Sequence, residues 1–172
     1  MMSRTVRTVA AIGAGLAALC GGTATAHADA PSYVRLQAEH SYKCLTIDGG
    51  RIGDNAYAVQ SSCDRNLDNQ LFELRPAGSG ALQVRAKHSG KCLTIGGEYK
   101  GNAAQQWCFD NDNQRWKVML VEVEEGLYEL RPVSDTAFCL TIPNHSYDDG
   151  AKSMLLSCIG ATDQRWRLLP AS

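Results

Sequence analysis

Six cysteines between residues 44 and 158 are the side chains of this chain with the most specific chemistry. Thiols of this kind either form disulfides or hold a metal ion. A zinc site of the finger type needs a Cys-x-x-Cys pair or a histidine at a fixed offset, and neither occurs here. An even cysteine set in an exported chain predicts three disulfides, although the cysteine count alone leaves the pairing open. We expect no metal and no cofactor.

The start of the chain is typical of an export signal. A short basic segment precedes an apolar run from residue 9 to 19, which is too short to span a bilayer as a helix, and Ala26-His27-Ala28 offers small residues to a signal peptidase. We predict cleavage before Asp29 and secretion into the extracellular space. A lipoprotein signal acylated at Cys20 is the alternative, and the bulky Leu19 in front of it disfavours that reading.

The chain contains three copies of one unit. Cys-Leu-Thr-Ile begins at residues 44, 92 and 139, and each copy is followed by a second cysteine, at residue 63, 108 or 158. Each unit then ends on a Gln-x-aromatic triplet: Gln70-Leu71-Phe72, Gln114-Arg115-Trp116 and Gln164-Arg165-Trp166. The same three features in the same order indicate a threefold internal repeat.

The repeat selects one disulfide pairing, because equivalent units carry equivalent crosslinks. We predict Cys44–Cys63, Cys92–Cys108 and Cys139–Cys158. A closed loop of this size contributes about 3 kcal/mol to stability on the loop-entropy description.

The elements that position these residues are short strands. Segments 33–38, 81–86 and 127–131 alternate apolar and polar residues, and segments 71–74 and 116–120 are rich in aromatic and β-branched residues. Such a unit cannot bury its own apolar face. We therefore predict an all-β domain over residues 29–172, a closed barrel of three four-stranded repeats at about 31–77, 78–124 and 125–170.

Composition excludes several classes of partner. The chain has 172 residues, 44% of them hydrophobic, and a formal net charge of -1, so it lacks the basic excess of a general nucleic-acid binder. We expect a monomer that contacts neither nucleic acid nor membrane.

The ordered set of Cys-Leu-Thr-Ile, cysteine and Gln-x-Trp resembles the ricin B-chain-like lectin family over residues 31 to 170. The resemblance implies a β-trefoil fold and up to three shallow carbohydrate pockets. It also implies that Phe72, Trp116 and Trp166 pack in the core.

The family's pocket combines an aspartate two residues after the first cysteine, an aromatic ring just before the second cysteine and an asparagine before the Gln-x-Trp glutamine. This chain departs from that pattern, because the aspartate position holds Thr46, Thr94 and Thr141. A threonine hydroxyl lacks the ionised oxygens that make charge-assisted bonds to sugar hydroxyls.

The resemblance ranks the second repeat first. Its candidate sugar contacts are Trp107, Asn113, Gln114 and Thr94, with Trp107 as the stacking ring. The first repeat offers Asn69, Gln70 and Asp48, with serines where the ring belongs. In the third repeat Asp163 replaces the asparagine and Leu156 stands near the ring position, so that pocket is expected to be degenerate.

The predicted function is a secreted, non-catalytic module that binds glycans weakly, mainly through the second-repeat pocket. No nucleophile elbow, zinc-protease motif or phosphate loop is present. The alternative is a trefoil that has lost sugar binding and contacts a protein, as a protease inhibitor or a surface-interaction protein. The three threonines support that alternative, because a fold does not fix a function.

Overall fold

The computed structural model describes residues 32–96 and 101–171, which belong to one compact unit, Pro31–Ser172. The predicted signal segment and its cleavage site lie outside the described residues. Within the described ranges, no helix is both long enough and apolar enough to cross a membrane.

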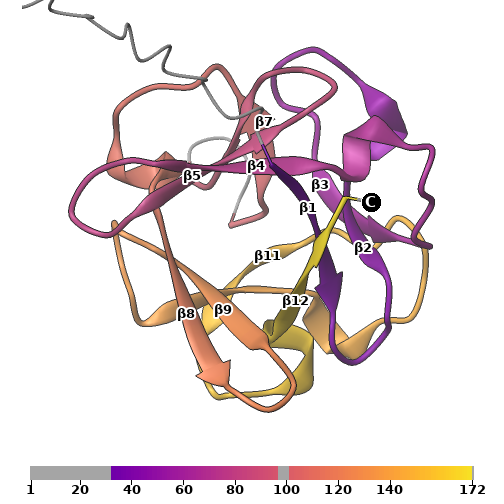
Figure 1. Cartoon of the computed structure of the whole chain (residues 1–172), viewed down its shortest axis with the longest axis vertical. Helices are drawn as coiled ribbons and strands as arrows, with labels where there is room; N and C mark the ends of the chain where they lie inside the picture. Colours follow the sequence, from indigo (N-terminus) through magenta and orange to yellow (C-terminus); the bar gives the residue numbers. More distant parts are fainter. Residues whose placement is uncertain (1–31, 97–100, 172) are drawn as a thin grey trace, which may run out of the picture. The chain divides into compact units, whose positions relative to one another are not determined.

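The strands fall four to a repeat (Figure 1). They are β1 Tyr33–Ala38, β2 Cys44–Ile47, β3 Ala58–Ser61 and β4 Phe72–Pro76; β5 Leu82–Ala86, β6 Cys92–Thr94, β7 Ala104–Gln106 and β8 Trp116–Glu122; β9 Leu127–Pro132, β10 Phe138–Thr141, β11 Met154–Ser157 and β12 Trp166–Pro170. A short 3-10 turn carries the Gln of each Gln-x-aromatic triplet: η2 Asp68–Gln70, η4 Asp112–Gln114 and η6 Thr162–Gln164.

Six strands close a barrel. β1 pairs with β12 and β4, β5 pairs with β4 and β8, and β9 pairs with β8 and β12, all antiparallel. The remaining strands form three hairpins, β2–β3, β6–β7 and β10–β11. Isolated bridges such as Val59 with Lys152 and Asn102 with Met154 join these hairpins. The predicted pseudo-threefold trefoil is confirmed.

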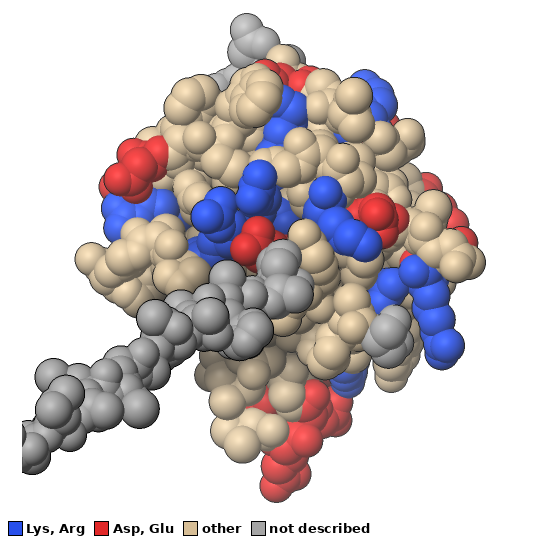
Figure 2. Space-filling model, turned by 45° about the horizontal axis from the view of Figure 1, so that its top comes forward, with Lys and Arg blue, Asp and Glu red and all other residues tan. Residues whose placement is uncertain are grey.

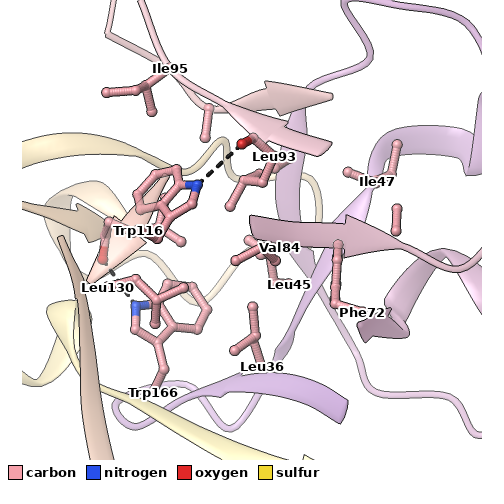
Figure 3. Close-up of a cluster of buried hydrophobic side chains, with 14 of the residues drawn as sticks. Leu36, Leu45, Ile47, Phe72, Val84, Leu93, Ile95, Trp116, Leu130 and Trp166 are labelled. Carbon is pink, nitrogen blue, oxygen red and sulfur yellow. Dashed lines mark hydrogen bonds between the residues drawn. The ribbon is translucent and has the colours of Figure 1, made fainter. Parts of the chain in front are cut away.

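The core collects the equivalent aromatic residue of each repeat. Phe72, Trp116 and Trp166 are each 0% exposed, together with Leu36, Val84 and Leu130 from the facing strands (Figure 3). The Trp116 indole N–H donates to the Leu93 carbonyl at 3.1 Å, and that of Trp166 donates to the Leu140 carbonyl at 3.0 Å. The polar atom of each buried indole is therefore satisfied.

The disulfides confirm the predicted pairing. Bonds join Cys44 to Cys63, Cys92 to Cys108 and Cys139 to Cys158. Each disulfide joins the first strand of one of the three hairpins to the segment that follows the second strand of the same hairpin. The family's pocket lies close to this segment.

Two buried glutamines hold a loop of a neighbouring repeat: Gln60 of the first repeat holds a loop of the third, and Gln105 of the second repeat holds a loop of the first. Gln60 donates its amide to the Ser146 and Asp148 carbonyls at 2.6 and 3.0 Å, and Gln105 donates to the Arg51 and Gly53 carbonyls, both at 2.7 Å. The hairpin registers place Leu155 at the third equivalent position. A leucine side chain has no amide to donate, so this tie is not repeated there.

Candidate functional site

The Gln-x-aromatic glutamines hold the segment after the second cysteine in each repeat. The Gln114 Oε1 atom accepts from the Phe109 N–H at 2.6 Å, and its Nε2 donates to the Trp107 carbonyl at 2.7 Å. Gln70 and Gln164 make the equivalent pairs of bonds. All three are nearly fully buried. The oxygen and the nitrogen of the Gln70 and Gln114 amides are thus both bonded within the fold. These two glutamines therefore support the wall of a pocket.

The three threonines are not equivalent. The Thr46 hydroxyl donates to the Cys44 carbonyl and accepts from Gln70, and Thr141 makes the same two bonds with Cys139 and Gln164. The Thr94 hydroxyl instead faces the Asn113 carbonyl at 3.5 Å, at the outer limit of a hydrogen bond. Of the three threonines, Thr94 lines the cavity of the second repeat that is described below.

In the first repeat, the asparagine is buried by its own loop. Asn69 is 9% exposed and donates its amide to the Ile47 carbonyl at 2.8 Å. Gly50, in the turn η1 Asp48–Gly50, lies beside the Asn69 amide. Asp48 pairs at 3.2 Å with the exposed Arg51 guanidinium. The structure therefore does not bring Asp48 and the Asn69 amide together around an open pocket.

In the third repeat, Asp163 stands at the position of Asn69 and is bonded within its own repeat. Asp163 is 5% exposed, and its Oδ2 atom lies 3.0 Å from Nδ1 of His145, in the turn η5 Pro143–His145. This pairing leaves Asp163 poorly placed to reach a ligand, in line with the degenerate pocket expected for this repeat.

The second repeat has an open cavity at the equivalent place. Its volume is about 230 Å³, and Asn113, at its floor, is exposed. Gly96, with φ of +85°, runs beside the Asn113 amide in a backbone conformation that favours glycine. The described residues that line the cavity are all uncharged: Thr94, Ile95, Gly96, Gln106, Phe109, Asn111, Asn113 and Gln114.

Trp107 does not line this cavity. The hairpin pairs Cys92 with Gln106, so Gln106 faces the cavity, and the next residue points to the other side. The Trp107 ring is 63% exposed and stacks on the Lys91 ammonium, 3.8 Å from the ring centroid. The four predicted second-repeat contacts therefore do not share one pocket.

The aromatic ring of the cavity is Phe109, which the sequence prediction missed. Phe109 follows Cys108 and is 57% exposed. Gln106, its neighbour in the cavity, was missed as well. One sequence signal could have found Gln106: alignment on the second cysteine puts it level with Ser61 and Leu156, and Trp107 one position further on.

The arrangement can recognise a small polar ligand. The amides of Asn111 and Asn113 offer donors and acceptors, as a pair of neighbouring hydroxyls requires, whereas the Gln106 amide already donates to Asn55 Oδ1 at 2.7 Å. The exposed Phe109 ring can cover an apolar C–H face, which offsets the cost of stripping water from a polar molecule.

The fold and this cavity define a β-trefoil domain of the lectin type. Residues 32–166 match the ricin-type beta-trefoil lectin domain, and the chain belongs to that family. No curated protein matches the chain at a significant level.

Several solved structures share the fold. The designed threefold symmetric protein ThreeFoil is 31% identical, with a TM-score of 0.73 over 80% of this chain and 97% of its own. The exo-beta-1,3-galactanase 1,3Gal43A from Clostridium thermocellum is 25% identical, with a TM-score of 0.74 over 83% of this chain and 31% of its own. The earthworm R-type lectin C-half, solved in complex with GalNAc, is 16% identical, with a TM-score of 0.65 over 81% of this chain and 99% of its own.

The match to the lectin family indicates carbohydrate binding as the general activity of the domain. The match to the galactanase covers only about a third of that protein. The fold is that of a ricin-type lectin domain, a class that is typically non-catalytic.

Proposed function

We propose that the protein is an exported, non-catalytic carbohydrate-binding protein whose main site is the cavity of the second repeat. The observation that carries the proposal is the contrast among the three repeats. Asn69 and Asp163 are buried and paired with their own loops, whereas Asn113 is exposed on the floor of an open cavity beside an exposed ring.

The ligand class follows from the lining. The described lining residues offer amides, a hydroxyl and one exposed aromatic ring, and a neutral sugar is the proposed ligand class. The Asn111 and Asn113 amides bind neighbouring hydroxyls, and Phe109 packs on the apolar face of the ring. A single shallow site of this kind corresponds to millimolar affinity, about -4 kcal/mol.

Trp107 stays a predicted contact for a longer ligand. Its outer face is open to solvent beside the cavity residue Gln106, and the Lys91 ammonium beneath it fixes the ring. A glycan that extends past Gln106 would reach this ring.

A glycan array with the mature, oxidised chain tests the proposal. Every hit is then measured with Asn113→Ala and Phe109→Ala, each expected to weaken binding about tenfold or more, as the loss of a stacking ring or a paired amide does. Ser61→Ala is the matched control, because Ser61 occupies in the first repeat the place of Gln106.

Three results are informative. Unchanged binding by Asn113→Ala and Phe109→Ala would move the site away from the cavity. A loss with Trp107→Ala that grows with glycan length would establish the extended contact. Absence of binding across a broad array, with the chain folded, would contradict glycan binding altogether.

One observation favours protein contact as a second candidate function. The β8–β9 hairpin exposes apolar side chains in one run: Met119, Leu120, Val121 and Val123 are 45%, 47%, 41% and 77% exposed. Exposed apolar side chains on both faces of a hairpin are available to a partner that packs around it. Val121→Ser with Val123→Ser would abolish such a contact and leave glycan binding unchanged.

A further inference from the structure

Arg35 is a buried charge without a counter-charge. It lies on β1 opposite Leu169 of β12 and is 7% exposed. Its Nη2 donates to the Arg65 carbonyl at 3.0 Å, while its Nε is buried with no partner. Among the residues that the structure describes, no carboxylate comes within 4.0 Å of its guanidinium, as the set of ion pairs shows. Burying a charge in this way is costly unless an ion of opposite sign joins it.

The Arg35 guanidinium borders a cavity of about 240 Å³, separate from the one in the second repeat. The cavity is lined by Arg35, Cys63, Asp64, Arg65, Leu169 and Pro170. Like Arg35, Arg65 makes no ion pair with a described residue. Two unpaired guanidiniums against one carboxylate leave a local positive excess, on a molecule whose basic and acidic side chains are otherwise interspersed over the face drawn in Figure 2.

The fold does not need the charge of Arg35. The equivalent position of the second repeat holds Gln83. Arg35 lies three residues before Ala38, which pairs with Trp166, and Gln83 lies three residues before Ala86, which pairs with Phe72. The Gln83 amide donates to the Phe109 carbonyl at 2.8 Å, just as Arg35 donates to the loop after Cys63. A neutral amide therefore suffices to hold this loop.

We propose that the cavity at Arg35 and Arg65 binds an oxyanion, either a carboxylate or a sulfate group. A guanidinium presents several N–H donors in a plane and forms short, charge-assisted bonds to such groups. Leu169 and Pro170 supply an apolar wall that suits the ring of an acidic sugar. This site is independent of the proposed neutral-sugar cavity, since the two share no lining residue.

Thermal unfolding of the oxidised chain tests the site, with sodium sulfate, sodium glucuronate, sodium acetate and glucose at constant ionic strength. Ligands that bind only the folded state raise Tm, by about 4 °C at roughly ten times Kd for a domain of this size. We expect sulfate and glucuronate to raise Tm through Arg35, whereas any rise with glucose comes from the neutral-sugar cavity and should be the same in the wild type and Arg35→Gln. A stronger effect of glucuronate than of acetate would assign the site to acidic sugars, and equal effects would assign it to free anions.

Four variants decide the residues involved. Arg35→Gln copies Gln83 and should abolish the rise in Tm caused by anions, and Arg65→Gln should reduce that rise. Asp64→Asn should increase it, because the Asp64 carboxylate repels an incoming anion. Asparagine keeps the bond that Asp64 accepts from the Asn66 N–H. Arg75→Gln, on β4, is the control for the loss of one surface charge. An equal Tm rise in the wild type and Arg35→Gln would overturn the proposal. If Arg35→Gln did not fold, unchanged anion effects in Arg65→Gln and Asp64→Asn would overturn it.

Discussion

The Lys91 ammonium lies 3.8 Å from the centre of the Trp107 ring and 2.7 Å from an Asp54 carboxylate oxygen. The lysine side chain is only 7% exposed, although the ring that it supports is open to solvent. Asp54 also accepts a hydrogen bond from the backbone N–H of Trp107 at 3.1 Å. A carboxylate of the first repeat thus fixes both the backbone and the ring support of a residue in the second.

We expect Lys91→Met to loosen Trp107. The variant removes the cation beneath the ring and the ionic partner of Asp54, at a cost of about 1 kcal/mol, since Asp54 is partly exposed and partly screened by water. Equilibrium urea unfolding measures that cost, and the emission of Trp107 should become more readily quenched by iodide. Unchanged quenching would show that the ring does not depend on Lys91.

Gln60→Leu should weaken the loop between Ser146 and Asp148. Leucine is the residue found at the equivalent position of the third repeat, so it should be accommodated, but it leaves the Ser146 and Asp148 carbonyls without their amide donor. We expect a loss of about 1–2 kcal/mol, because Gln60 is buried. Amide hydrogen exchange should become faster in this loop than in the loop around Arg51, which Gln105 holds. Equal exchange in both loops would contradict this role for Gln60.

Asp149 should make stability depend on pH in the acid range. Hydrogen bonds from Lys43 and, to a lesser extent, Ser62 lower the pKa of the Asp149 carboxyl below its usual value of 3.8. Because the folded pKa is the lower one, the contribution is fully present above the unfolded value and disappears as the pH falls through the folded pKa. The wild type should exceed Asp149→Asn in Tm near neutral pH, and the difference should shrink as the pH falls below 3.8 and disappear in stronger acid. A difference that persists there would have another cause.

The Cys92–Cys108 bond should contribute to stability about as much as its two equivalents. Its sequence separation is 16, against 19 for each of the others, and the entropy of loop closure changes slowly with length. Replacing both cysteines with serine should therefore cost about 3 kcal/mol in denaturant unfolding. The matched control is the Cys44, Cys63 pair treated in the same way, and a difference above about 1 kcal/mol between the two double variants would contradict loop entropy as the main contribution.

The sequence predicted the framework more fully than the site. The repeated cysteines and Gln-x-aromatic triplets have one consistent arrangement in space, which is why the disulfides and the barrel could be predicted. The orientation of Trp107 depends on the register of β6 with β7, where a shift of one residue exchanges the two faces of the strand. The bond from the Asn69 amide to the Ile47 carbonyl and the pairing of Asp163 with His145 depend on how each loop folds, so neither could be predicted from motifs.

The glutamine ties between repeats set a rule for engineering this scaffold. A loop from the first or third repeat is held by an amide that belongs to the neighbouring hairpin, at Gln105 or Gln60. Grafting such a loop alone onto another trefoil would leave its carbonyls without donors. The smallest portable segment is therefore a loop together with the glutamine of its neighbour, and a library that randomises one loop should keep that distant position constant.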